Sequence, residues 1–206
     1  MPSLPPKTRA RAPDQARNRG IVTKLRNNDK DWLLTVANVV LILAEILFVF
    51  ALIAVVFGIV AVLTFARGKV AADLATAGAP HGTYWAVVAV LALVWGMLSL
   101  SMLFVRQLRA IVLTVNEGDP FLPDNAVRLA RLGWYALGEQ VLEFVGQPLV
   151  AAYGKYAAGF GRGIGARLSS EPHVSLAPLA LAVTLFILAR VFRQGAAMRA
   201  DLEGTV

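Results

Sequence analysis

The chain has 206 residues, of which 57% are hydrophobic and only 16% are charged. Soluble domains carry about 25% charged residues, so this composition excludes an ordinary soluble enzyme, a disordered chain and a fibrous protein. The sequence contains no cysteine, which excludes disulfides, thiol nucleophiles and thiolate metal ligands. Its net charge of +7 comes from 20 Lys and Arg against 13 Asp and Glu, and in a membrane protein such an excess first reflects topology.

The amino-terminal segment, residues 1–31, is basic and rich in proline. It holds eight Lys and Arg residues and four prolines, and it shows no apolar period. We therefore predict a disordered cytoplasmic tail that lies close to anionic lipid headgroups. The apolar stretch that follows, Trp32–Ala66, is far longer than the roughly 7–15 residues of a signal-peptide core, which favours a retained signal anchor. Nucleic-acid binding by the tail is the alternative, and we favour the topology signal.

Four stretches of the sequence are apolar enough to cross a membrane, which takes roughly 20 residues in a helix. We predict spans at about 44–66, 84–105, 133–153 and 174–192. The predicted fold class is therefore all-α, a polytopic membrane protein with a four-helix transmembrane domain over residues 32–206.

The third and fourth predicted spans are the less regular ones. The third contains several polar residues, and a soluble hairpin helix is its alternative. The grouping of these polar residues on one helical face favours a span that faces other helices. The fourth is continued by Val191 and Phe192 around Arg190, and it spans if Arg190 and Arg193 extend their guanidinium groups to the interface.

The distribution of basic residues predicts the orientation. Fifteen of the 20 Lys and Arg residues lie in the amino-terminal segment, between the second and third spans, or at the carboxyl-terminal end. The two other connections hold the remaining five. Because cytoplasmic segments carry the excess of Lys and Arg, we place both termini and the middle connection of this multi-pass membrane protein in the cytoplasm.

Polar residues recur at helical spacing inside the third predicted span. They are Glu139, Gln140, Glu143 and Gln147, and Glu45 is the one charged residue of the first apolar stretch. Ionisable groups at membrane depth commonly face the interior of a helix bundle and mark functional sites. One interpretation is a proton or cation site. The other, which we favour, is a structural hydrogen-bond network.

We call residues 106–134, between the second and third predicted spans, the elbow. Apolar residues at i, i+3, i+4 and i+7 predict that the second span continues as an amphipathic helix, which a glycine and two prolines then end. A capping Asp or Asn predicts a second helix that carries Arg128 and Arg131 on one face. Insertion of Phe121 into the bilayer is the alternative to partner docking. The predicted partner-binding residues are Asp119, Pro120, Phe121, Asn125, Arg128, Arg131 and Trp134.

The pattern GDPF-x-P-x-NA-x-RL-x-x-LGW, Gly118–Trp134, resembles the signature of a bacterial integral membrane family catalogued as domain of unknown function 2975. The end of the chain, Val191–Val206, is similar to the closing pattern of that family, a basic helix followed by D-x-E-x-T-V. The resemblance implies four transmembrane helices, a place in the bacterial plasma (inner) membrane, and a regulatory partnership with small DNA-binding proteins. It implies no enzymatic activity.

We therefore predict a non-enzymatic regulatory or interaction protein that binds a soluble cytoplasmic partner, such as a small DNA-binding regulator, through the elbow and the carboxyl-terminal tail. The alternative is a small proton- or cation-coupled transporter or channel that uses Glu45, Glu139 and Glu143. We predict no catalytic residue, cofactor or metal ligand, because no nucleophile–base pair or metal-binding spacing is present. The expected partners are the lipid bilayer and this regulator, without direct nucleic-acid contact. The sequence leaves open whether the chain forms a homo-oligomer.

Overall fold

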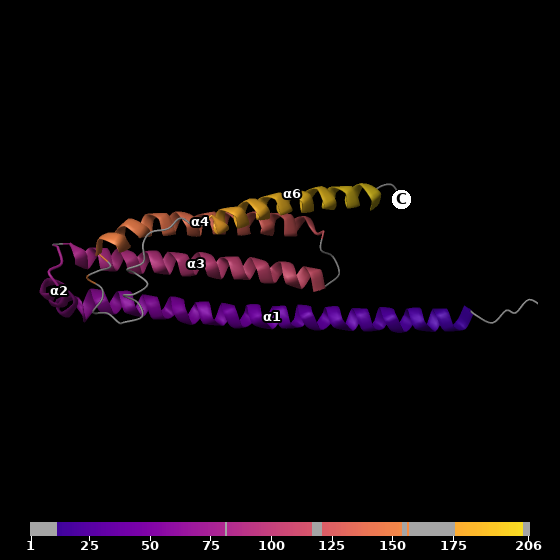
Figure 1. The fold of residues 1–206 in the computed structure, drawn as a ribbon, viewed down its shortest axis with the longest axis horizontal. Helices are drawn as coiled ribbons and strands as arrows, with labels where there is room; N and C mark the ends of the chain where they lie inside the picture. The colour runs from indigo at the N-terminus through magenta and orange to yellow at the C-terminus, as the bar shows by residue number, and fades with distance from the viewer. Residues whose placement is uncertain (1–11, 81, 117–120, 154–155, 157–175, 204–206) are drawn as a thin grey trace, which may run out of the picture.

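The computed structural model describes residues 12–80, 82–116, 121–153, 156 and 176–203. Within these residues the chain folds into five helices, which confirms the all-α class. They are α1 (Ala12–Thr64), α2 (Arg67–Thr76), α3 (Thr83–Asn116), α4 (Pro123–Tyr153) and α6 (Ala177–Glu203). Figure 1 shows the four long helices packed lengthwise, with the short α2 at one end of the bundle.

Helix α1 begins at Ala12, so the backbone is helical over residues 12–31, where the sequence analysis predicts a disordered tail. Three of the four prolines of the amino-terminal segment precede Ala12. The fourth, Pro13, is in the first turn of the helix, where the N–H that proline lacks has no helical partner to lose. Beyond Pro13 the segment is rich in Arg and Lys, which are good helix formers.

Helices α1 and α3 are antiparallel. Near one end of the pair, the Tyr84 hydroxyl donates a hydrogen bond of 3.0 Å to the carbonyl oxygen of Val62. Further along, Arg109 of α3 forms an ion pair with Glu45 of α1. Residue numbers thus rise along α3 as they fall along α1.

The remaining long helices continue this antiparallel order. The end of α3 meets the start of α4 through Thr114 and Asn125, and the first half of α4 meets α6 through Gly133 and Phe186. The amino-terminal part of α1, the end of α3, the start of α4 and the carboxyl-terminal end of α6 therefore lie toward the same end of the bundle (Figure 1).

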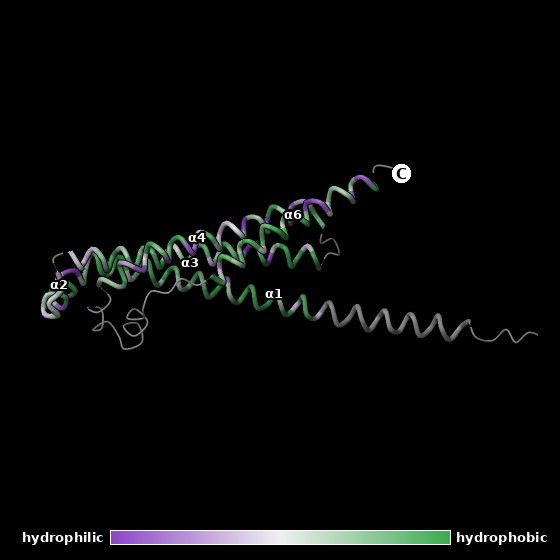
Figure 2. The backbone as a smooth tube through the Cα atoms, turned by 45° about the horizontal axis from the view of Figure 1, so that its top comes forward, coloured by the Kyte–Doolittle hydropathy of each residue, from purple (hydrophilic) through white to green (hydrophobic). Residues whose placement is uncertain are grey.

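Three helices of the described chain are long and apolar enough to cross a membrane: Trp32–Thr64, Thr83–Val115 and Ala177–Leu202. Their large apolar side chains are widely exposed, with Leu47 at 70% and Phe57 at 71%. Figure 2 shows hydrophobic residues in green along α1 and α3, and hydrophilic residues in purple at α2 and near the carboxyl end of α6. Soluble monomers rarely expose apolar surface on this scale, so the helices indicate a membrane protein.

The predicted third span lies within α4, which is not one of these three helices. Its apolar sequence is interrupted by two Glu, two Gln and Pro148, which lower its hydropathy. The described structure therefore confirms three apolar helices of spanning length and does not confirm four spans.

A buried apolar cluster joins α4 to its two neighbours. Leu129 and Leu132 of α4 and Ala189 of α6 form a buried cluster, against which Phe104 and Ile111 of α3 pack. This cluster adjoins the elbow, so the packed core holds the elbow helices in place.

Candidate functional site

The two arms of the elbow are joined by a polar network. Asn125 is fully buried, and its Nδ2 donates a hydrogen bond of 2.8 Å to Thr114 Oγ1 at the end of α3. Arg128 Nη1 donates to Asn125 Oδ1 at 3.0 Å and to the Ala110 carbonyl oxygen at 3.2 Å. Asn125 and Arg128 thus tie the start of α4 to the last turns of α3, and they hold the shape of the elbow.

Phe121 is the aromatic residue of the elbow, and it packs on α6. Its ring centroid is 5.4 Å from that of Phe192, and Gly195 leaves the space into which the ring fits. A Cβ atom at Gly195 would lie 2.9 Å from Phe121 Cδ1. Phe121 keeps 44% of its surface exposed, so it both anchors the elbow to α6 and contributes to the outer surface.

The other predicted partner-binding residues differ in their positions. Arg131 is exposed on α4, and Trp134 is 66% exposed with its ring edge-on to Phe186 of α6 at 5.5 Å. Asp119 and Pro120 lie outside the described residues.

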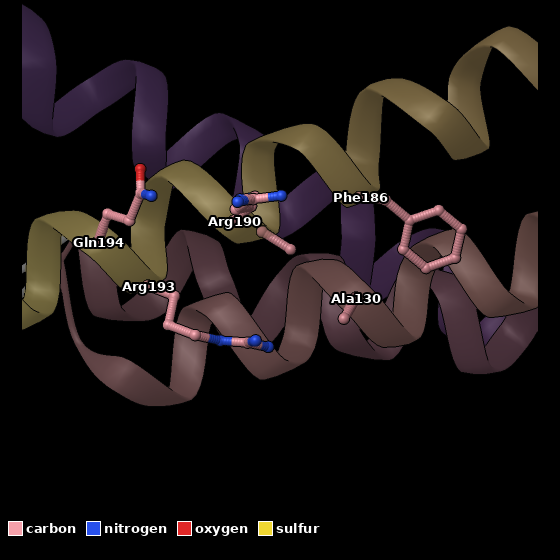
Figure 3. Close-up of a pocket in the computed structure, with 6 residues that line it drawn as sticks. Ala130, Phe186, Arg190, Arg193 and Gln194 are labelled. Atoms are coloured by element: carbon pink, nitrogen blue, oxygen red, sulfur yellow. The ribbon is translucent and has the colours of Figure 1, made fainter.

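A groove of about 500 Å³ lies between α4 and α6 beside the elbow. Figure 3 shows Arg190, Arg193 and Gln194 extending from α6 along the groove, with Ala130 of α4 and Phe186 beside them. Arg190 and Arg193 are both exposed. Two guanidinium groups at one apolar groove can bind carboxylate or phosphate groups in bidentate fashion.

Glu45, the charged residue of the first apolar stretch, is neutralised by α3. Arg109 Nη1 is 3.0 Å from Glu45 Oε2, and Arg109 Nε donates to Asn38 Oδ1 at 3.1 Å. The Arg109 and Glu45 side chains are 32% and 19% exposed. These contacts link α1 to α3, so the Glu45–Arg109 pair has a structural role.

The polar residues of α4 divide between two interactions. The Ser101 hydroxyl of α3 donates to Glu139 Oε1, and Gln140 Nε2 donates to Glu143 Oε2 at 3.3 Å on the same helix. Gln147 is partly buried one turn beyond Glu143. In the described part of the chain, no hydrogen bond or ion pair joins Glu45 to Glu139 or Glu143.

A second cavity, of about 400 Å³, contains Glu139. It is lined by residues of all four long helices: Phe48, Ser101, Phe104, Val105, Ala136, Glu139, Ala177, Pro178 and Leu181. Apart from Ser101 and Glu139, its lining side chains are apolar. The described ranges place no group of three or more His, Cys, Asp or Glu residues to hold a metal ion.

Three contacts of these sites were not anticipated from the sequence. Arg109 pairs with Glu45 across 64 residues, and Ser101 reaches Glu139 across 38. Thr114 Oγ1 accepts a hydrogen bond from Asn125 Nδ2 across the elbow. A polar residue inside an apolar stretch indicates that a polar contact exists. Which partner it contacts depends on how two helices are rotated relative to each other, and a single sequence does not contain that information.

Comparison of the chain with protein-family models, curated proteins and solved structures found no match. The resemblance carried by Gly118–Trp134 and Val191–Val206 therefore stays a prediction.

Proposed function

We propose that the protein is a multi-pass integral protein of a bacterial plasma membrane, crosses it four times, and keeps both termini and the elbow in the cytoplasm. The direction of the helices supports this topology. Helix α6 runs parallel to α3 and is also long and apolar, so if both cross the membrane they cross it in the same direction. The chain then has to return between them, and α4 is the helix that lies there.

The two faces of α4 support a crossing as well. Val141, Phe144 and Val145 are exposed on its outer surface, at 60%, 69% and 49%. Glu139 and Gln140, at the same depth, are partly buried. Apolar side chains outside and polar side chains inside form the pattern of a helix whose surroundings are lipid.

The charge distribution supports the orientation. The end of the bundle where α3 ends and α4 begins is also the end toward which the amino-terminal part of α1 and the carboxyl end of α6 extend. The sequence regions at this end are the amino-terminal segment, the elbow and the carboxyl-terminal end. Together these regions hold 15 of the 20 Lys and Arg residues. Cytoplasmic segments carry this excess, so we assign this end to the cytoplasm.

The function that we propose at this end is non-enzymatic binding of a soluble regulatory protein. The observation that carries it is the groove with Arg190 and Arg193, where Phe186 packs against the exposed Trp134. Arg131 and Phe121 are exposed as well. Arginine and aromatic residues are enriched at protein-binding hot spots, and an arginine groove fits an acidic surface on the partner. The family resemblance adds that the partner is a small DNA-binding regulator.

The described contacts assign different tasks to the residues of the elbow. Asn125 and Arg128 face inward and fix its shape, whereas Arg131, Phe121 and Trp134 supply exposed surface. The transporter alternative needs its carboxylates to act together. Glu45 is paired with Arg109 instead, so we propose the interaction function.

Site-specific photo-crosslinking in membranes of the native host tests this function. A photoreactive amino acid at Gln194, inside the groove, is expected to capture a soluble protein, and the same amino acid at Ala75, in α2 at the opposite end, is not. Arg190→Gln with Arg193→Gln should remove the adduct, because the partner loses both guanidinium contacts.

The matched control is Arg67→Gln with Lys69→Gln, which removes two exposed charges at the α2 end. It should leave the adduct at Gln194 intact. The proposal is overturned if the adduct survives the loss of both groove arginines, or if positions 194 and 75 capture the same proteins.

A further inference from the structure

The cavity that contains Glu139 lies where α6 begins, beside the middle of α3 and α4. Ala177 and Pro178, the first residues of α6, form one wall, and Ser101 and Glu139 form another. Its volume of about 400 Å³ is within the roughly 300–1,000 Å³ that is common for small-molecule sites. The proposed partner surface uses none of these residues.

Glu139 is the one ionisable side chain among the residues described in this cavity. Its contact is with the neutral hydroxyl of Ser101, and within the described residues it has no Arg, Lys or His partner. Glu45 of the same bundle differs, because Arg109 neutralises it at 3.0 Å. A carboxylate among apolar side chains is costly unless a positive charge is nearby, so the cavity favours a cationic occupant.

The walls determine which kind of cation fits. Phe48 and Phe104 can bind a cation over their faces, and Leu181 adds apolar surface. A metal ion such as Ca²⁺ that sheds its water takes about six or more oxygen ligands, and the residues described in this cavity offer two oxygen-bearing side chains, Ser101 and Glu139. A single carboxylate with aromatic and aliphatic walls favours a cation whose positive centre is surrounded by apolar groups.

We propose that this cavity binds a lipophilic organic cation, of the quaternary ammonium or phosphonium class. The positive centre lies against the Glu139 carboxylate, and the apolar groups of the ligand lie against Phe48, Phe104 and Leu181. Ser101 holds the carboxylate toward the cavity through its hydrogen bond to Oε1. This inference is independent of the proposed partner-binding function at the other site.

The test uses the full-length protein in a non-ionic detergent and measures binding of tetraphenylphosphonium by equilibrium dialysis. Tetraphenylborate, an anion of the same shape, serves as the matched ligand. We expect the phosphonium to bind and Glu139→Gln to weaken it by about tenfold or more, since an interaction with a charged group is lost. Glu143→Gln, one turn further along α4 and outside the cavity lining, should change the affinity little.

A second variant keeps the charge and fills the space. Ala177→Trp places an indole at the exposed rim of the cavity, and it should abolish phosphonium binding although Glu139 is intact. This variant also decides the question if Glu139→Gln fails to fold. The proposal is overturned if the phosphonium does not bind, if tetraphenylborate binds equally well, or if the folded variants bind like the wild type.

Discussion

Asn125 is the residue that most directly fixes the elbow. It is fully buried, its amide nitrogen bonds Thr114, and its amide oxygen accepts from Arg128. Buried polar networks that are satisfied hold one arrangement firmly, because losing one member leaves the others unpaired in a low-dielectric environment. The start of α4 is therefore fixed against the end of α3 by side chains of the elbow itself.

Replacing Asn125 by alanine tests this role. The variant leaves Thr114 and Arg128 without their shared partner, and we expect the free energy of unfolding to fall by about 1–3 kcal/mol. Unfolding by SDS in mixed micelles, followed by circular dichroism, measures the change. Arg131→Ala, at an exposed position further along the same helix, is the control and should lie close to the wild type. Equal stability of the two variants would contradict the network.

The residue scale is also where the sequence was least informative. The elbow pattern drew attention to Asn125 and Arg128, but as surface residues that contact a partner. The structure places both against α3. Arg109, which looks like one more basic residue at the end of a span, is instead the partner of Glu45. Amino-acid type and spacing identify such residues. The direction in which their side chains point depends on how two helices are rotated relative to each other.

At the scale of elements, the apolar periods were informative. The expected continuation of the second span past Val105 agrees with α3, which runs to Asn116. Helix α4 begins at Pro123 and continues to Tyr153 without a break, so the second helix of the elbow and the third apolar stretch are one helix. Helix α1 extends further toward the amino terminus than expected, because proline at the first turn of a helix does not disrupt it.

Glycine determines how closely α4 and α6 approach. A Cβ atom at Gly133 would lie 2.9 Å from Cε1 and Cζ of the Phe186 ring, whereas one at Gly58 on α1 would meet nothing within 4 Å. The ring of Phe186 also packs edge-on against Trp134, which limits its freedom to move away. Gly133 therefore lies at a close helix–helix contact, whereas Gly58 has open space around it.

The element-scale prediction compares Gly133→Ala with Gly58→Ala. Both substitutions gain about 1 kcal/mol of helix propensity, but the alanine at Gly133 also forces the helices apart. We expect Gly133→Ala to be less stable than Gly58→Ala by about 1–3 kcal/mol, measured by SDS unfolding in mixed micelles. If both variants gain equal stability, α4 and α6 are not packed as closely at Gly133 as the structure places them.

At the scale of the whole molecule, the order of the helices follows from short connections. Each long helix packs against the next long helix along the chain, and neighbours are antiparallel. This arrangement is expected from hydropathy and connection length alone. The stagger of the helices is not: α6 begins beside the middle of α4, which creates the cavity at Glu139. Stagger depends on side-chain packing between helices that are distant in sequence, so the cavity could not be predicted.

The number of crossings is the whole-molecule property on which the proposed function depends, and residue 200 decides it. If α4 crosses, Ala200 near the end of α6 and Asp124 at the start of α4 are both cytoplasmic. If α4 stays on the cytoplasmic side, α6 crosses outward and Ala200 becomes external.

The chain has no cysteine, so Ala75→Cys, Asp124→Cys and Ala200→Cys each carry a unique label site, and all three positions are exposed. With a membrane-impermeant maleimide on intact cells, we expect labelling at position 75 alone, and labelling at 124 and 200 after permeabilisation. Labelling of position 200 on intact cells would leave α4 outside the membrane and place the arginines of α6 at the external face, where a cytoplasmic regulator cannot reach them.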